Sequence, residues 1–352
     1  MKLTNIALFM AGLSFNALAI ENGTPVNWNE QNDFVKLYSA DEYNSCSGTI
    51  IAGKYVLTAA HCLLDSNPIV KITSASGQKA NIITPNTHSA YYDNYNGGTG
   101  NWHDVAVSEL NNHIDTQQIH FFSSSMTNPI QTDDSVNVFG FGGTYEDLNY
   151  ATFTITNRKP EEDSVYAAMI ANGGNTTGGD SGGAWVNSNN EIVATHKGGV
   201  WTVDVNENRT RETYSTNLHY SKDFILEKVN GWHYPTLANT SNGVATIEIQ
   251  SLHQGDVDLL SDLYFFGDVD VDEARGTCVT DRTISPFEVC TLEVSSNGGE
   301  GTIVLANGQE IQINKPAPTV TPPVTSGGGE SGGSLGFLSI IGLLGLGFIR
   351  KK

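Results

Sequence analysis

The sequence predicts an all-β protein with a single convincing helix, built as two successive β domains. Between residue 20 and about residue 235, short apolar runs are broken by Gly, Asn, Asp and Ser, a pattern typical of short strands joined by turns. From about residue 236 to residue 314 a second region alternates apolar and polar positions, with turn signals at Asn297-Gly-Gly and Asn307-Gly. With 352 residues in the chain, two domains are expected.

The first domain is predicted over residues 20–235. The helix is predicted over Ser221–Trp232, where Ser221 can cap the N-terminus and residues 224, 225, 226 and 229 form an apolar stripe. It ends the domain. The clearest strand candidates are Phe34–Tyr38, Gly48–Ala60, Ile69–Ile72 and Ser135–Phe141.

The second domain, residues 236–315, is predicted to be a small β-sandwich from alternating segments at 244–249, 289–294 and 302–305. The stretches around Cys278 and Cys290 resemble the paired-cysteine edge of bacterial immunoglobulin-like modules. The acidic run from Asp268 to Glu273 is either a calcium site or a solvated loop. No Gly-punctuated ligand loop surrounds it, which favours the solvated loop, and we expect no metal.

The first 19 residues predict a signal peptide. Lys2 precedes an apolar run from Ile6 to Phe15, and Ala17-Leu18-Ala19 is a small-x-small cleavage pattern. A retained N-terminal anchor is the weaker alternative, because the run is shorter than the roughly 20 residues that span a bilayer. We therefore expect export.

The C-terminal end carries a second membrane signal. Residues 316–334 are a Pro/Thr/Gly/Ser linker, and residues 335–349 are uncharged and followed by the basic residues 350–352, which should stay cytoplasmic. This ending resembles the GlyGly-type C-terminal sorting signals of Gram-negative bacteria. The resemblance implies type II secretion, a transient inner-membrane anchor at residues 335–352, a sorting protease, and an extracellular or cell-surface protein. A permanent single-span transmembrane helix is the alternative, although the segment is short for one.

Charge and cysteines narrow the class further. The formal charge is −20, and without the four basic residues of the terminal signals it is 14 − 38 = −24, which argues against nucleic acid and anionic lipid as partners. The four cysteines form two close pairs, Cys46 with Cys62 and Cys278 with Cys290. In an exported chain two disulfides are expected, whereas a zinc site would require cysteines and histidines spaced more closely along the chain.

Three short motifs together supply the parts of a serine nucleophile site. Gly179-Asp-Ser181-Gly-Gly places a serine among glycines, so that the N–H groups of Gly179 and Ser181 can point at one oxyanion. Thr58-Ala-Ala-His61-Cys62 ends a predicted strand with a possible base. Asp104 enters an apolar strand, where a partly buried carboxylate would have a histidine as partner.

These three motifs, in the order His61, Asp104, Ser181, resemble the signature motifs of trypsin-like serine proteases over about residues 20–232. The resemblance implies a chymotrypsin-like double β-barrel with a C-terminal helix. It also implies a secreted endopeptidase that hydrolyses polypeptides through an acyl-enzyme, with no cofactor. In this family a new N-terminus pairs with the Asp before the nucleophile. Ile20, exposed by cleavage after Ala19, would therefore pair with Asp180.

The substrate pocket is less regular. Asn175 stands where trypsin has a pocket-base Asp, so it offers no salt bridge, and Gly199 lies on the strand that resembles the pocket wall. Either Lys197 or Thr195 stands at the usual Ser position of that strand, depending on register. Glu212 either receives a basic side chain or is an exposed loop charge. Cleavage after Arg or Lys is the first expectation.

Two other classes compete with the endopeptidase. One is a catalytically silent, protease-like surface binding protein or adhesin, against which the intact triad argues. The other is an esterase, whose Gly-x-Ser-x-Gly elbow places the serine first along the chain, unlike the order found in this sequence.

Overall fold

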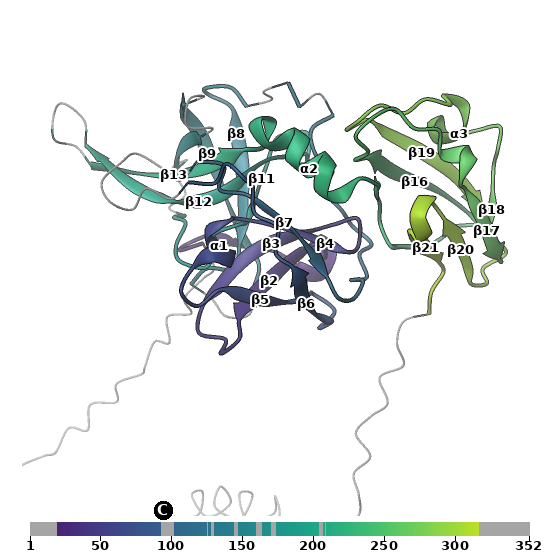
Figure 1. Ribbon diagram of the computed structural model, residues 1–352, viewed down its shortest axis with the longest axis horizontal. Coiled ribbons are helices and arrows are strands. Elements are labelled where there is room, and N and C mark those ends of the chain that lie inside the picture. Colours follow the sequence, from purple (N-terminus) through teal and green to yellow (C-terminus); the bar gives the residue numbers. More distant parts are fainter. Residues whose placement is uncertain are drawn as a thin grey trace, which may run out of the picture. The chain divides into compact units, whose positions relative to one another are not determined.

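The computed structural model describes residues 20–92, 102–124, 126–127, 130–143, 147–159, 164–169, 174–203, 207 and 209–316. Within them the chain forms two six-stranded β-barrels followed by two four-stranded sheets (Figure 1). Helices are few and short. The predicted all-β class is confirmed, together with the double barrel that the family resemblance implied.

The first barrel closes because β2 pairs with both β3 and β5. Its core contains Val35, Leu37, Val56 and Ile72. The predicted run Gly48–Ala60 forms two strands of a hairpin, with a turn between them. In ring order the strands are β2 (Phe34–Ser39), β3 (Ser45–Ile51), β4 (Tyr55–Thr58), β7 (Ala106–Leu110), β6 (Lys79–Thr84) and β5 (Ile69–Thr73).

The second barrel closes in the same way, because β8 pairs with both β9 and β11. Trp185, Phe153 and Ile155 lie in its core, and so does Ile20, at the start of the described chain. In ring order the strands are β8 (Ser135–Gly140), β9 (Asn149–Lys159), β10 (Ser164–Met169), β13 (Arg209–Asn217), β12 (Ile192–Val203) and β11 (Ala184–Val186), with β1 (Thr24–Pro25) added beside β9.

The predicted helix is confirmed as α2 (Lys222–Val229), with its four apolar positions buried. Ser221 is the N-cap, but its hydroxyl is buried and makes no hydrogen bond within the described structure, so it does not cap the helix as predicted. Asn230 ends the helix in the left-handed conformation. The other helices are α1 (His61–Leu64), α3 (Thr277–Thr280) and the 3₁₀ segments Trp28–Gln31, Leu218–Ser221, Leu259–Ser261 and Ala306–Gly308.

The C-terminal region contains two four-stranded sheets, and its three predicted strand segments are present. The second sheet system begins before the predicted boundary at residue 235, because β14 already pairs with β16. Gln250 of β16 bonds both the N–H and the C=O of Phe122, which ties this region to the barrels. One sheet holds β14 (Trp232–His233), β16 (Val244–Ser251), β19 (Val289–Ser295) and β18 (Asp270–Val271), and the other holds β15 (Leu237–Ala238), β21 (Glu310–Ile313), β20 (Gly301–Val304) and β17 (Tyr264–Gly267).

Both predicted disulfides are formed, Cys46–Cys62 in the first barrel and Cys278–Cys290 between α3 and β19. Because disulfides persist in oxidising compartments, they indicate an exported protein. The predicted signal peptide and the hydrophobic C-terminal segment lie outside the described residues. None of the helices that the structure does describe has the length and apolar character to cross a membrane.

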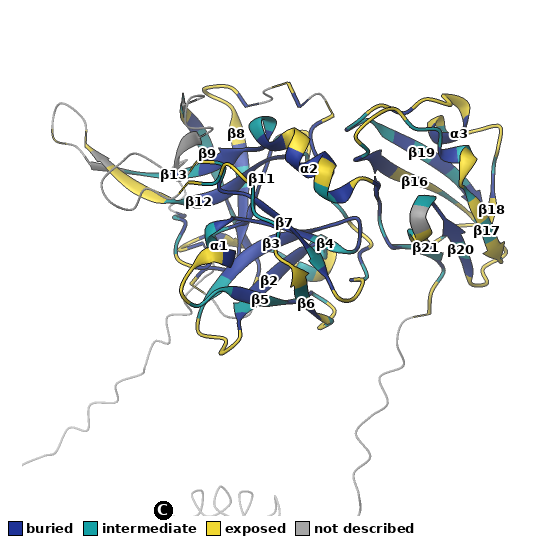
Figure 2. Cartoon of the chain, viewed as in Figure 1, coloured by how far each residue is buried: buried dark blue, intermediate teal, exposed yellow. Residues whose placement is uncertain are grey.

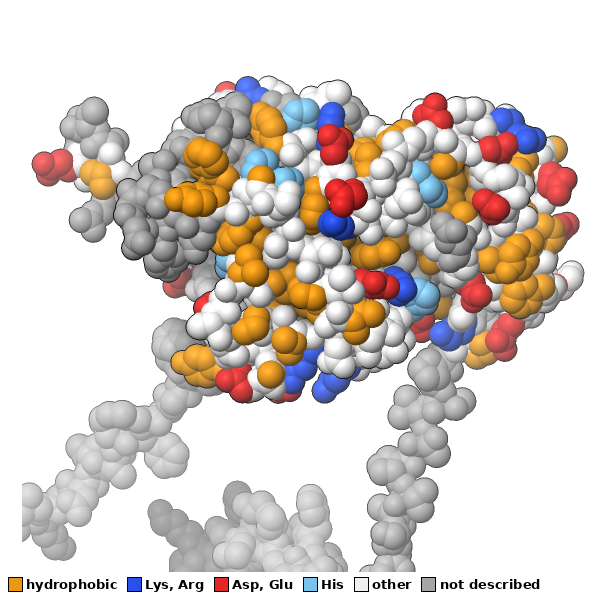
Figure 3. All heavy atoms as spheres, in the orientation of Figure 1, with side chains coloured by type: hydrophobic (Ala, Val, Ile, Leu, Met, Phe, Trp, Pro, Cys, Tyr) orange, Lys and Arg blue, Asp and Glu red, His pale blue; other side chains and the backbone are white. Residues whose placement is uncertain are grey.

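The surface of the described residues shows how burial and charge are distributed. The barrel strands are largely buried and the connecting loops are exposed (Figure 2). On the face seen in Figure 3, acidic side chains are scattered, not gathered into one patch.

Candidate active site

His61 and Asp104 form a hydrogen-bonded pair on neighbouring segments of the first barrel. His61 opens α1 directly after β4, and Asp104 lies just before β7, which pairs with β4. The backbone N–H of His61 donates to Asp104 Oδ1 at 2.9 Å, and His61 Nδ1 lies 2.7 Å from Asp104 Oδ2. Asp104 is fully buried, whereas the His61 side chain is 30% exposed. With Nδ1–H directed at the carboxylate, Nε2 is left as the proton acceptor.

Ser181 lies in the loop before β11, and the first barrel holds this loop in place. Ser47 of β3 donates its N–H to Ser181 O and its hydroxyl to Gly179 O, each at 2.8 Å. The Ser181 hydroxyl donates to Lys197 O at 3.4 Å. This contact places the backbone of Lys197 beside the serine. Sequence reasoning missed Ser47, because nothing along the chain indicates that β3 faces this loop.

Two glycines of the serine motif occupy positions that a residue with a Cβ could not readily take. Gly179 has φ +101°, a conformation that residues with a Cβ rarely adopt. Gly182 has φ +82°, and a Cβ there would lie 2.0 Å from Thr58 Oγ1 and 2.3 Å from Ser47 O. The glycines therefore allow the serine loop to pack directly against the first barrel.

A pocket of about 330 Å³ brings the motifs together. It is lined by His61 and Cys62 from the first barrel and by Gly178, Gly179 and Ser181 from the second. The predicted base and the predicted nucleophile thus face the same space from two barrels.

Asp180 is fully buried behind the serine. Its Oδ1 accepts from Gly142 N and its Oδ2 from Thr177 N, both at 2.7 Å, and the backbone N–H of Ile20 also donates to it. Burial raises the pKa of Asp180 to about 7, although these three donors favour its charged form. The structure therefore places the backbone N–H of Ile20 against the carboxylate of Asp180.

The predicted pocket residues have different partners. Asn175 pairs with Glu21 beside Ile20, where its N–H donates to Glu21 O at 2.8 Å, and Gly199 lies on β12 opposite Thr213. Glu212, by contrast, accepts a 2.6 Å hydrogen bond from Thr156 on β9.

Sequence reasoning missed four residues near the predicted pocket wall, Thr176, His196, Arg211 and Thr213. The hydroxyl of Thr213 is directed at Thr176 and His196, and the guanidinium of Arg211 lies close to Gly199. The only signal in the sequence was that Thr176 adjoins Asn175 and that Arg211 and Thr213 flank Glu212, two residues already considered for the pocket.

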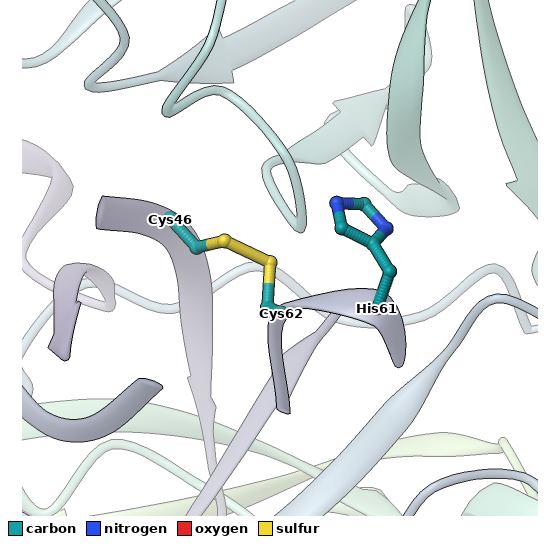
Figure 4. Close-up of side chains that lie close together, drawn as sticks. All are labelled: Cys46, His61 and Cys62. Carbon is teal, nitrogen blue, oxygen red and sulfur yellow. A yellow bond between two sulfur atoms is a disulfide. The ribbon is translucent and has the colours of Figure 1, made fainter. Parts of the chain in front are cut away.

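No metal-ion chemistry is suggested by the one group of potential ligands found among the described residues. Atoms of Cys46, His61 and Cys62 lie within 4.8 Å of one another. The two sulfur atoms are joined to each other in a disulfide, beside which the His61 ring lies (Figure 4), so neither sulfur is a thiolate ligand. Asp268, in the acidic run considered for calcium, instead accepts hydrogen bonds from Asn297 and Gly299.

Many solved structures resemble this chain, among them the following three. Vibrio cholerae VesB protease is 21% identical, with 84% of this chain and 99% of that chain covered and a TM-score of 0.46. The secreted serine protease VesC from Vibrio cholerae is 16% identical, with coverages of 83% and 70% and a TM-score of 0.46. A mutant of human heparin binding protein is 15% identical, with coverages of 59% and 96% and a TM-score of 0.49. No curated protein matches the sequence.

The family of this chain is shown by the similarity of its sequence to one protein family. The Trypsin family matches residues 20–225, a segment that contains His61, Asp104 and Ser181 and forms both barrels. It covers more than half of the 352 residues. The chain therefore belongs to the trypsin family of serine proteases, whose substrates are polypeptides.

Proposed function

We propose that the protein is a secreted serine endopeptidase with His61, Asp104 and Ser181 as its catalytic triad. The observation that carries the proposal is the shared pocket, in which a histidine bonded to a buried carboxylate meets a serine held among glycines. Ser181 Oγ attacks the peptide carbonyl while His61 Nε2 takes its proton. The N–H groups of Gly179 and Ser181 stabilise the oxyanion.

The reaction passes through an acyl-enzyme. His61 returns its proton to the leaving amine, and the acyl group stays on Ser181 Oγ. A water molecule, deprotonated by His61, then attacks the ester and releases the acid product. Asp104 stays ionised throughout and stabilises the imidazolium that forms in each half of the reaction.

Processing completes the site in this proposal. Cleavage after Ala19 would convert the Ile20 N–H, which already donates to Asp180, into an ammonium group that pairs with the same carboxylate. Before cleavage Ile20 has φ +43°, which is unfavourable for a β-branched residue, and an N-terminal residue has no φ to restrain. Both observations favour a mature chain that begins at Ile20.

The cellular route follows from the sequence signals. We propose export through residues 1–19, type II secretion, and removal of the transient inner-membrane anchor at residues 335–352 by a sorting protease. The mature protein would then be extracellular or displayed at the cell surface. Mass spectrometry of the secreted protein tests this route, which requires a first residue of Ile20 and a last residue before residue 335.

The sequence expectation of cleavage after Arg or Lys depends on Glu212. Because Thr156 donates a hydrogen bond to the Glu212 carboxylate, that carboxylate already has a partner on the neighbouring sheet surface. We therefore do not assign the substrate's side chain to Glu212.

Active-site labelling tests the proposed chemistry. A fluorophosphonate with no side chain to select should modify Ser181 in the processed protein, and peptide mapping should locate the adduct there. The Ser181→Ala variant is the control and should remain unlabelled. A folded, processed protein that is not labelled would favour the silent binding protein.

A further inference from the structure

Beside Ser181, a buried group of polar side chains lies between β12 and β13 and takes no part in the proposed triad chemistry. Thr213 Oγ1 lies 3.0 Å from Thr176 Oγ1 and 3.2 Å from His196 Nδ1. Thr176, His196 and Thr213 are each exposed by 2% or less.

This group abuts the nucleophile. The N–H of His196 donates to Gly183 O at 2.8 Å, and the C=O of His196 accepts from Gly182 N at 2.9 Å, so β12 is bonded to the two residues after Ser181. The next residue, Lys197, accepts from the Ser181 hydroxyl. A substrate side chain entering next to the serine would therefore meet this group.

Arg211 brings a positive charge to the same place. Its Nη2 donates to Thr176 O at 2.7 Å, and its Cζ lies 5.8 Å from the centre of the Trp201 ring. Its Nε is buried and makes no hydrogen bond within the described structure. A guanidinium does not lose its proton in proteins, so this is a fixed charge. Its neighbour Glu212 points to the opposite face of β13, where its carboxylate accepts a hydrogen bond from Thr156.

The guanidinium lies beside the predicted pocket wall. A Cβ added to Gly199 would be 3.4 Å from Arg211 Nη2 and 3.5 Å from Arg211 Nε. The absence of a side chain at Gly199 therefore lets the guanidinium pack directly against this strand. Asn175, predicted at the pocket base, adds no opposing charge.

The histidine of the group adds a hydrogen-bond donor and no charge. Burial, followed by the nearby charge of His61, lowers the pKa of His196 to about 3. A neutral imidazole has one N–H to donate, and each threonine hydroxyl has one O–H. The group thus combines one fixed positive charge with several donors, which suits a carboxylate, whereas a Lys or Arg side chain would meet a like charge.

We propose that Thr176, His196, Arg211 and Thr213 form the primary specificity pocket, and that it binds a carboxylate, so that the enzyme cleaves after Glu or Asp. This inference rests on the proposed endopeptidase function. It replaces Glu212 with its neighbour Arg211 as the charge that selects the substrate.

A set of peptides that differ only in the residue before the cleaved bond tests the inference directly. With the processed wild-type enzyme, Glu or Asp at that position should give a kcat/KM at least about 30-fold higher than Gln, and higher still than Arg or Lys, since truncating a buried charge pair commonly costs that much. Equal rates for Glu and Gln, or a preference for Arg or Lys, would overturn it.

Two neighbouring variants sharpen the test. Arg211→Gln should remove the preference for Glu over Gln while leaving phosphonate labelling of Ser181 in place. Glu212→Gln is the matched control and should leave the preference unchanged. The opposite pattern, in which only Glu212→Gln alters selectivity, would contradict the assignment to Arg211.

Labelling separates the two levels of failure. An enzyme that is labelled at Ser181 but prefers basic residues keeps the proposed function and loses the carboxylate pocket. A processed, folded protein that is neither labelled nor active loses both. The wild-type peptide series does not depend on whether either variant folds.

Discussion

Two histidine–aspartate pairs in this molecule have nearly the same geometry and different surroundings. His61 uses its backbone N–H and Nδ1 to contact Asp104, and His120 uses the same two groups to contact Asp33, at 2.8 and 2.9 Å. Both carboxylates are fully buried, but the His61 side chain is 30% exposed and that of His120 only 3%.

What differs is the surroundings of each ring on the side away from the carboxylate. His61 shares a pocket with Ser181, whereas His120 forms a side-chain hydrogen bond with Asn190 and stacks on Phe34 with ring centroids 4.8 Å apart. A hydrogen-bonded His–Asp pair is therefore not by itself sufficient for the histidine to act as a general base. An imidazole in this setting becomes catalytic where its outer nitrogen meets a nucleophile, and elsewhere the same pair acts as a structural tie.

The largest contrast is expected from histidine removal at each pair. His61→Ala should lower kcat/KM by about 10⁴-fold or more, because it removes the base, with little change in the free energy of unfolding. His120→Ala should lower the free energy of unfolding by about 3 kcal/mol, because it leaves Asp33 buried without its partner. Peptide hydrolysis per folded molecule and urea unfolding measure the two effects. Equal loss of activity per folded molecule in both variants would contradict the conclusion that the two pairs have different roles.

The carboxylates should show the same division. Asp104→Asn should lower kcat by roughly 10⁴-fold, as the same change does in the known Ser-His-Asp triad of this family, because the amide favours the wrong tautomer of His61. Asp33→Asn should leave kcat near the wild-type value and lower the unfolding midpoint in urea. If Asp104→Asn kept its activity, His61 would not depend on this carboxylate.

Processing should change how stability depends on pH through Asp180. While Ile20 N is an amide, the pKa of Asp180 is raised from 3.8 to about 7. The stabilisation that protonated Asp180 gives the folded state is therefore fully present below about pH 3.8 and is lost as the pH rises through 7. At about 1.4 kcal/mol per unit, an unprocessed chain should lose roughly 4 kcal/mol over that range.

A chain that begins at Ile20 should lose much less, because its ammonium pairs with the carboxylate. Urea unfolding at pH 4 and pH 7 of this chain, and of one extended by two residues, measures the difference. Asp180→Asn in both chains is the control and should abolish it. Identical pH profiles for the two chains would show that the ammonium does not reach Asp180.

The smallest effect is expected from the titration of His120. Burial opposes its charged form, but the charge of Asp33 and hydrogen bonds to Asp33 and Asn190 outweigh burial and raise the pKa of His120 above 6.5. The stabilisation is therefore fully present below about pH 6.5 and is lost as the pH rises through the raised value. The stability difference between wild type and His120→Gln should shrink from pH 6 to pH 9, and a difference that grew would contradict this sign.

Sequence and structure agree best where the information is local. The motifs around His61, Asp104 and Ser181 each lie within a few residues, the cysteine pairs are close along the chain, and the stripe of α2 follows one helical period. The pocket was not predictable in this way. A β-bulge between His196 and Gly198 shifts the pairing of β12 with β13. This shift decides which side chains face the proposed pocket, and it cannot be predicted from the sequence alone.

Hydrolysis of a mixed peptide library by the secreted protein, compared with its Ser181→Ala variant, tests the central claim most directly. The account predicts cleavage by the processed wild-type protein and none by the variant, with both proteins equally stable to urea. Cleavage that persists in Ser181→Ala, or a folded and correctly processed wild-type protein that cleaves no peptide, would contradict the assignment of Ser181 as the nucleophile of an active endopeptidase.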